Sequence, residues 1–393
     1  MDETVKGAEA AEKVPRRRGA RSMTAVSLPY PENAALAMIA HHAGERRLRE
    51  VVAPRRGIVP SPHHDTLVVP PLSLVGEAVR VIGNRLPLEQ AAPTGMYAQK
   101  RIFDLAASRV LAASTGIVIG FPGASLLTFR KATRAKRVFH AVDAHPRAHN
   151  ARLLAHFDRD EVRRELYPSW LVDVIEEELD LADAVLVPSR LVFNQMVVHG
   201  TPAEKIIVEP YGVDVGHFVP TGGDDDAARS RPRIVYVGQI SRRKGISFLV
   251  EAARSADVDI ELVGNVYDQA LVRDLPDNVH VRGATDKVGI RSAFARADAF
   301  VIPSVEDACS LVVFEALAVG LPVIGTDANG AFEATLGMPT TVVAAGNVTE
   351  LGSALAAVEP LETEARTRTA LEARHRLRSW SAYAEHVAQR LNT

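Results

Sequence analysis

The feature that most constrains the fold is a regular alternation in the second half of the chain. Six short β-branched runs begin 18–26 residues apart between residues 233 and 343, and helical apolar patterns lie between most of them. Short buried strands joined by helices need right-handed crossovers, which give a parallel sheet covered on both faces. The pattern predicts a Rossmann-like layer. The expected strands are Arg233–Val237, Asp259–Val263, Val279–Arg282, Ala299–Ile302, Val323–Thr326 and Thr341–Val343, and the expected helices are Gly245–Ser255, Gly289–Ala295 and Leu311–Val319.

The first half of the chain alternates in the same way, with less regular spacing. A helical pattern covers Glu32 to His42, and residues Pro54–Pro71, rich in Pro and His, are typical of a loop. This half therefore predicts a second α/β layer. Its apolar runs are Thr24–Leu28, Thr66–Val69, Gly116–Ile119, Arg137–Val142 and Ala184–Val187.

At 393 residues the chain is long enough for two domains. Gly222-Gly223 and Asp224–Asp226 cannot pack into a core and mark a linker between the two halves. We expect a disordered tail at 1–22, a first domain at 23–218, a linker at 219–232, a second domain at 233–375 and a final helix at 376–393. Trp380 and Tyr383 suggest that this helix packs back on the first domain.

The composition excludes several classes of protein. With 47% hydrophobic and 24% charged residues and a net charge of −2, the chain is globular and has no global field that attracts nucleic acid. One cysteine, Cys309, excludes a disulfide framework, and no histidine pair has the spacing of a metal motif. No apolar run is long enough for a membrane span, and the first residues do not resemble a signal peptide. We expect a cytoplasmic protein without a metal.

The first segment with candidate functional residues is the loop from Gly238 to Gly245. A strand ends at Gly238, three successive cations (Arg242, Arg243 and Lys244) follow, and Gly245 opens a helix. Ligands of parallel α/β sheets bind at the carboxyl ends of strands, where this loop must lie. Arginine and lysine there can neutralise a diphosphate, although a solvated turn explains the charges equally well.

The second segment runs from Pro303 to Ala316. A strand ends at Pro303 and a helix begins near Ser310, so the amides around Ser310 and Leu311 can face phosphate oxygens at a helix N-terminus. Glu315 lies among apolar neighbours and needs a partner there. The two hydroxyls of a ribose would meet that need; an exposed glutamate on an amphipathic helix is the alternative.

Three further segments repeat the arrangement of a strand followed by a glycine turn or a cap. Gly325–Glu333 ends in a carboxylate, although Asp327 and Glu333 are also consistent with simple helix capping. In the first half, Ala182–Ser189 is a buried strand that runs into a serine cap, and Gly200–Asp214 ends in a Tyr-Gly-Val-Asp turn.

As a set, these segments resemble the retaining glycosyltransferases of family 4, which have the GT-B fold. The matching motifs are the strand, glycine and Lys-Gly loop, Pro-Ser, the spaced carboxylates, Glu-Ala, Gly-x-Pro-Val-Ile and the small-residue turn before Glu333. The resemblance is good over roughly residues 180–345 and weak before them. It implies two Rossmann-like domains that face each other across a cleft.

The resemblance also implies roles for single residues. Lys244, with Arg243 or Arg242, would hold the donor diphosphate, Glu315 would bind the ribose, and the amides of Ser310 and Leu311 would face the donor phosphate and sugar. Two positions depart from the family pattern. Asp307 stands where the first glutamate of the carboxylate pair is expected, with Glu306 one position off register, and Gln239 replaces an arginine. We expect Asp307, or Glu306 in its place, to contact the donor sugar.

The first domain offers weaker candidates. His145 follows the strand that ends near Val142 and could bond to a donor hydroxyl, although a structural histidine fits as well. A basic cluster made up of Arg130, Lys131, Arg134, Lys136 and Arg137 lies nearby. It is consistent with a solvated surface, an anionic acceptor, or peripheral contact with the inner face of a membrane.

By resemblance, the protein transfers a sugar from a nucleotide-sugar donor to a glycan, lipid or small-molecule acceptor with retention of configuration. No nucleophilic carboxylate is evident, which favours front-face displacement, and Arg243 and Lys244 can take the place of a metal. A nucleotide-sugar epimerase and a non-catalytic nucleotide-sugar-binding relative are the alternatives.

Overall fold

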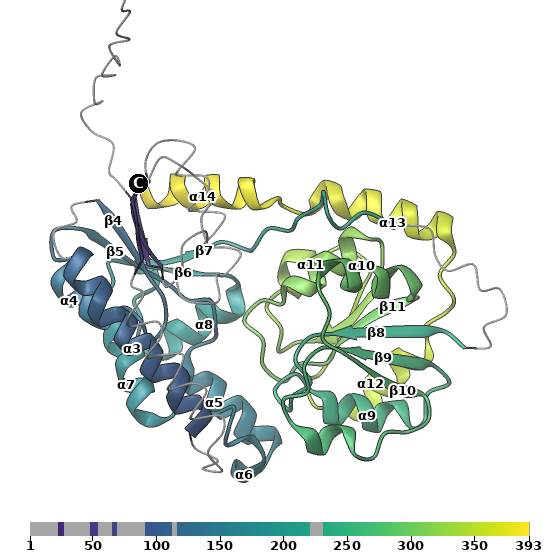
Figure 1. Cartoon of the computed structure of the whole chain (residues 1–393). Coiled ribbons are helices and arrows are strands. Elements are labelled where there is room, and N and C mark those ends of the chain that lie inside the picture. The colour runs from purple at the N-terminus through teal and green to yellow at the C-terminus, as the bar shows by residue number, and fades with distance from the viewer. Residues whose placement is uncertain are drawn as a thin grey trace, which may run out of the picture.

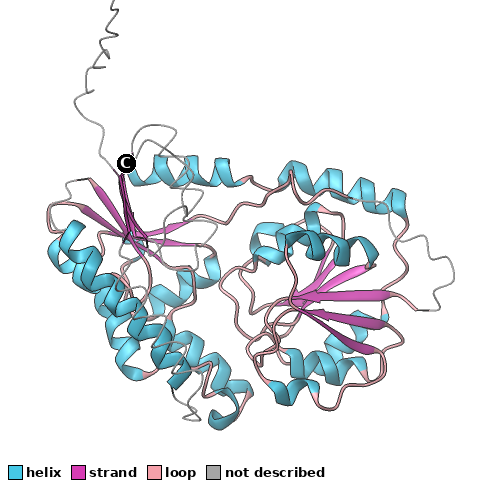
Figure 2. Ribbon diagram, viewed as in Figure 1, coloured by secondary structure: helices cyan, strands magenta, loops and turns pink. Residues whose placement is uncertain are grey.

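The computed structural model describes residues 23–26, 48–53, 65–68, 91–111, 116–220 and 231–392. The chain forms two parallel sheets, one from each half of the sequence (Figure 1). Helices lie on both faces of each sheet (Figure 2). The predicted tail at 1–22 and the predicted helix from Glu32 to His42 lie outside the described residues.

The first sheet has seven strands in the order β3-β2-β1-β4-β5-β6-β7, and all neighbours are parallel. The sequence did not predict β2. The apolar run Thr66–Val69 overlaps β3, although β3 also lies inside the segment Pro54–Pro71 that was expected to be a loop. A short strand is shaped by its neighbours in the sheet, which outweigh the local signal of Pro and His around it. The strands are β1 (Met23–Val26), β2 (Leu48–Ala53), β3 (Asp65–Val68), β4 (Ile117–Gly120), β5 (Lys136–His140), β6 (Ala184–Val187) and β7 (Ile206–Val208).

The helices of the first domain pack around this sheet. Two of them, α5 and α6, form a short hairpin that reaches toward the second domain (Figure 1). The helices are α3 (Ala91–Leu111), α4 (Leu126–Lys131), α5 (Pro146–His156), α6 (Arg159–Val162), α7 (Ser169–Leu181) and α8 (Arg190–Val198).

The second sheet has six parallel strands in the order β10-β9-β8-β11-β12-β13. The predicted doubly wound α/β layer is confirmed, and the strand bounds agree with the sequence pattern to within one residue. The order reverses direction between β8 and β11, so loops after these two strands meet at the switch point where ligands bind. The strands are β8 (Arg233–Val237), β9 (Asp259–Val263), β10 (Val279–Gly283), β11 (Ala299–Ile302), β12 (Val323–Thr326) and β13 (Thr340–Val343).

The helices of the second domain cover both faces of its sheet. Figure 1 shows α9 and α12 on one face and α10 and α11 on the other. The predicted helices are confirmed with small changes at their ends. The helices are α9 (Ile246–Ala253), α10 (Lys287–Arg296), α11 (Leu311–Ala318), α12 (Val348–Ala356), α13 (Thr363–Arg376) and α14 (Trp380–Asn392).

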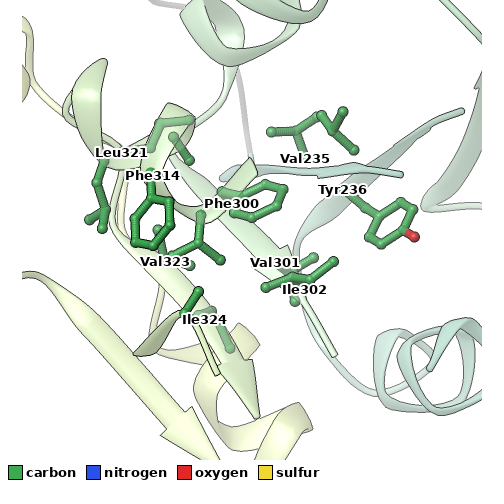
Figure 3. Packing of buried hydrophobic residues seen from close by; sticks show 14 of the residues in the cluster. Val235, Tyr236, Phe300, Val301, Ile302, Phe314, Leu321, Val323 and Ile324 are labelled. Carbon is green, nitrogen blue, oxygen red and sulfur yellow. The ribbon is translucent and has the colours of Figure 1, made fainter. Parts of the chain in front are cut away.

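The core of the second domain explains why the apolar runs in the sequence predicted its strands. Every residue of β11 is buried, and Phe300 packs against Val235 of β8 and Phe314 of α11 (Figure 3). The ring of Phe294 meets Phe300 edge-on, with the ring centroids 5.8 Å apart. Strands buried on both faces are continuously apolar, so the sequence marks them clearly.

The last helix leaves the second domain and lies on the first. After α13, the Val213 N–H donates to the Arg378 carbonyl at 2.8 Å, and α14 continues along the first domain (Figure 1). Tyr383 is fully buried there, its ring meets that of Tyr211, and its hydroxyl lies 3.3 Å from His140 Nε2. Lys136 Nζ donates to the Leu391 carbonyl at 2.7 Å.

None of the helices in the described parts of the chain combines the length and the apolar character that crossing a membrane requires.

Tyr383→Ala is expected to destabilise the protein by about 3–5 kcal/mol, because loss of a buried aromatic ring leaves a cavity between α14 and the first domain. Tyr383→Phe keeps the ring and should cost only about 1 kcal/mol for the lost hydrogen bond. Leu371→Ala, at a side chain that is 55% exposed on α13, is the control. Thermal unfolding of the three variants measures the difference, and equal melting temperatures would contradict the proposed anchoring of α14.

Candidate functional site

Two loops of the second domain meet at the switch point. Residues 238–245 follow β8 and residues 303–310 follow β11. The Val305 N–H donates to the Arg243 carbonyl at 2.9 Å. Gly245 has φ +73°, and a Cβ there would lie 1.8 Å from the carbonyl oxygen of Pro303. Only glycine allows this approach, so the sequence fixes the contact between the loops.

Lys244 and Asp307 form an ion pair across these two loops. Lys244 Nζ lies 2.5 Å from Asp307 Oδ2, and both side chains are largely buried. Ser304 Oγ approaches the same oxygen at 3.4 Å. The structure therefore brings together the cation predicted for the diphosphate and the carboxylate predicted for the donor sugar. In this arrangement each neutralises the other.

Glu306 points away from Lys244 and is buried at the domain interface. Its Oε2 lies 2.8 Å from His149 Nδ1 and 3.6 Å from the Arg243 guanidinium. Burial alone would raise the pKa of Glu306, but the charges and the hydrogen bond of its partners outweigh burial and lower the pKa to about 2. Burial lowers the pKa of Arg243, but the carboxylates of Glu306 and Asp307 outweigh this effect and raise it. Glu306 is therefore an ionised carboxylate.

Arg242 does not face the Lys244–Asp307 pair. Its guanidinium lies 3.0 Å from Glu161 and 3.1 Å from Asp268, and it stacks over the ring of Phe157. Of the two arginines expected beside Lys244, only Arg243 turns toward the loop 303–310.

Glu315 lies on α11, and the pKa of its carboxyl group is raised. Burial raises its pKa to about 7, with Lys287 lowering it and Asp214 raising it. Within the described parts of the chain, Glu315 has no hydrogen bond or ion pair. A half-buried carboxylate without a partner can accept hydrogen bonds from a ligand.

The start of α11 follows the predicted position. Ser310 is the N-cap residue and Leu311 the first helical residue, and the Ser310 amide donates to Asn329 Oδ1 at 3.2 Å. A phosphate at the Ser310 amide would have to replace Asn329. Glu333 accepts from the Arg190 amide of the first domain at 2.8 Å, so its carboxylate joins the two domains.

A cavity of about 240 Å³ opens at the carboxyl ends of β8, β9 and β10. Gln239, at the position where an arginine was expected, lines it together with Asn265 and Thr285. The other lining residues are Val237, Gly238, Val263, Gly264, Ala284 and Ile290.

His145 lies inside the first domain, where its ring supports helix ends. Its Nδ1 accepts from the Arg147 amide at the start of α5, and its ring stacks on His199 with centroids 4.3 Å apart. Burial, followed by His199, lowers its pKa to about 4. These contacts are those of a structural histidine that is buried and neutral. A contact between His145 and the donor sugar stays a prediction.

Two of the five residues of the predicted basic cluster in the first domain pair with carboxylates of the same domain. Arg130 pairs with Glu177 at 2.5 Å and Arg137 with Asp183 at 2.8 Å. Lys136 and Lys131 donate to the Leu391 carbonyl and to Ser108. This pairing favours the interpretation as a solvated surface.

Two residues at the interface, His149 and Glu165, were not predicted from the sequence. They come from the α5–α6 hairpin and the turn after it, which carry no motif. A paired histidine and glutamate sixteen residues apart have no recognisable spacing. Across the described residues, no group of three metal-ligating side chains lies close enough to hold an ion.

Residues 231–358 match the family model described as glycosyl transferases group 1. This segment belongs to that family. The resemblance predicted from the motifs is therefore confirmed, and the matched segment is the domain that carries Lys244, Asp307 and Glu315.

Curated relatives match part of the chain. A GDP-mannose-dependent alpha-mannosyltransferase of Mycobacterium tuberculosis is 31% identical over 155 residues, which are 38% of this chain and 40% of the relative. A D-inositol 3-phosphate glycosyltransferase of Xylanimonas cellulosilytica is 27% identical over 179 residues, 39% of this chain and 43% of the relative. The chain thus spans about two fifths of the length of these relatives.

Solved structures extend the likeness to both domains. A sucrose-phosphate synthase of Thermosynechococcus elongatus superposes with a TM-score of 0.68 at 18% identity, over 94% of this chain and 98% of that one. Anabaena HepE, solved with UDP-glucose, gives a TM-score of 0.65 at 17% identity, over 94% and 99%. The predicted GT-B fold is confirmed.

The raised pKa of Glu315 predicts how stability changes with pH. The folded protein binds a proton at Glu315 more tightly than the unfolded chain does, so this stability is fully present below the ordinary glutamate pKa of about 4.3. It is lost as the pH rises through about 7. Glu315→Gln should therefore flatten the decline in unfolding free energy over that range. Denaturant unfolding at several pH values measures it, and an unchanged slope would contradict the assignment.

Proposed function

We propose that this protein is a retaining glycosyltransferase that moves a sugar from a nucleotide-sugar donor to an acceptor hydroxyl. The family match of residues 231–358 and the GT-B fold support this proposal. The observation that carries it is the Lys244–Asp307 pair at the switch point of the second domain. A cation and a carboxylate at the carboxyl ends of neighbouring strands suit a ligand with an anionic and a hydroxylated part.

The donor diphosphate would replace Asp307 as the partner of Lys244. Asp307 would then be free to accept a hydrogen bond from a hydroxyl of the donor sugar. As the glycosidic bond breaks, negative charge develops on the diphosphate, and Lys244 with Arg243 would stabilise it. These cations would act without a metal. Because no sequence motif supplies a nucleophilic carboxylate, the acceptor would attack from the face that the diphosphate leaves.

The nucleoside would lie toward the cavity at the ends of β8, β9 and β10. Glu315 would accept hydrogen bonds from the ribose hydroxyls, and its proton would be released when they bind. The relatives act with GDP-mannose or on inositol 3-phosphate by name, and HepE was solved with UDP-glucose. We therefore propose a nucleoside diphosphate hexose as the donor class and a sugar, lipid or small molecule with a free hydroxyl as the acceptor.

Lys244→Ala is expected to weaken binding of UDP or GDP by about 1.5–3 kcal/mol, the range for hydrogen bonds to charged groups. Isothermal titration calorimetry with each nucleotide measures the effect. Lys131→Ala, which removes a lysine from α4 of the first domain, is the control and should bind normally. Normal binding by Lys244→Ala would remove Lys244 from the site.

Asp307→Asn is expected to lower turnover strongly and to leave nucleoside diphosphate affinity near normal, because that product lacks the sugar. A lost transition-state interaction reduces turnover about ten-fold per 1.4 kcal/mol. Glu306→Gln should reduce turnover less, since its carboxylate faces His149 and not the Lys244 side. Release of nucleoside diphosphate with a panel of donors measures both.

Two outcomes would contradict this assignment. If Glu306→Gln is inactive and Asp307→Asn is near wild type, Glu306 contacts the sugar. If both variants keep full activity, neither carboxylate takes part in transfer.

A further inference from the structure

The first domain inserts a carboxylate into the loop that carries Lys244. Glu165 accepts hydrogen bonds from the backbone amides of Arg242, at 3.1 Å, and Arg243, at 3.2 Å. Two successive amides that bind one carboxylate form an anion-binding nest. The negative charge in this nest comes from the other domain, so the conformation of the loop 238–245 is set across the interface.

His149 binds the second loop in the same way. Its Nε2 lies 2.9 Å from the Glu165 carbonyl oxygen and its Nδ1 lies 2.8 Å from the Glu306 carboxylate. Both partners are acceptors, since a carbonyl oxygen has no proton and the Glu306 carboxylate is ionised. Both ring nitrogens therefore face acceptors, and an imidazolium is the form of the ring that donates at both positions. The ion pair is buried, with 5% of His149 and 3% of Glu306 exposed.

Arg243 joins the two contacts into one network. Its guanidinium donates to the Glu306 carbonyl at 3.2 Å, and its own amide binds Glu165. Lys244 and Asp307 are the next residues along each loop. Any movement of Glu165 or His149 is thus transmitted to the pair proposed to bind the donor.

An apolar contact holds the α5–α6 hairpin in place. Leu153, Val162 and Leu166 pack with Val305 of the second domain in one buried cluster. The rings of Phe157 and Phe248 lie 5.3 Å apart at its edge. The hairpin and the turn after it therefore bury part of the two loops and also place polar and charged side chains against them.

We propose that His149 and Glu165 are positioning residues for the donor site, which hold the loops of Lys244 and Asp307 in their working geometry when the two domains are in contact. The inference rests on the proposed function and adds a requirement to it. The loops are completed by the first domain, so a donor bound to the second domain alone is bound weakly. Donor affinity then depends on the contacts that His149 and Glu165 make with the two loops.

Substitutions of His149 separate its two hydrogen bonds. The amide of His149→Gln reaches the Nε2 position and keeps the bond to the Glu165 carbonyl, whereas that of His149→Asn lies at the Nδ1 position and keeps the bond to Glu306. Both lack the charge. Each should weaken binding of UDP or GDP about ten-fold or more, on the scale of a lost charge-assisted hydrogen bond. His156→Gln, on the same helix but against Phe248, is the control and should bind normally.

Glu165→Gln tests the nest itself. It should weaken nucleotide binding to a similar extent, because the amide offers one neutral oxygen to two donors. Glu161→Gln is the matched control. Glu161 crosses the same interface to the Arg242 side chain, but its carboxylate is exposed and touches neither amide.

Hydrogen exchange provides a readout that needs no nucleotide. The amides of Arg242 and Arg243 should exchange slowly in the wild type and faster in Glu165→Gln. If the wild type binds no nucleotide while exchange behaves as expected, the proposed function fails and the cross-domain contact stands. If the wild type binds nucleotide, and the His149 and Glu165 variants bind it equally with unchanged exchange, the positioning role is wrong.

Discussion

The ion pair between His149 and Glu306 is the interaction on which the arrangement of the site depends. A buried carboxylate is costly unless a cation and hydrogen bonds compensate it. Glu306 obtains its closest partner from the other domain, and its second oxygen, Oε1, has no hydrogen-bond partner among the described residues. The buried carboxylate of the loop 303–310 is therefore compensated only when the first domain lies against this loop. Because Arg243 contacts Glu306, the loop 238–245 depends on the first domain in the same way.

This dependence explains how three successive cations are accommodated in one short loop. Arg242, Arg243 and Lys244 would repel one another if they all faced the same volume. Each has a different carboxylate instead, with Asp268 and Glu161 for Arg242, Glu306 for Arg243 and Asp307 for Lys244. Only the Lys244 pair lies where the proposed diphosphate would bind, so the other two charges organise the loop.

Two residues of the candidate site, Gln239 and Asp307, depart from the family pattern. Gln239 leaves the site without one expected guanidinium, and Arg243 is the remaining arginine that turns toward the loop of Asp307. The aspartate side chain is one methylene shorter than glutamate, and at this length Asp307 meets Lys244 at 2.5 Å.

The sequence by itself determined the second domain almost completely. Its strands are buried on both faces, so each is a continuous apolar run, and Gly238, Gly245 and Pro303 mark the loops between strand and helix. Lys244, Asp307, Ser310 and Glu315 follow from those loops. The short strand β2 was missed, and β3 was marked only by the run Thr66–Val69 inside an expected loop, because the order of both strands comes from neighbours in the sheet, which local composition does not record. Only the tertiary structure decided that Arg242 turns away, that Glu306 is buried, and that His149 and Glu165 complete the loops. Hydrogen bonds between residues of different domains leave no periodic trace in a sequence, since their partners are chosen by the packing of one domain on the other.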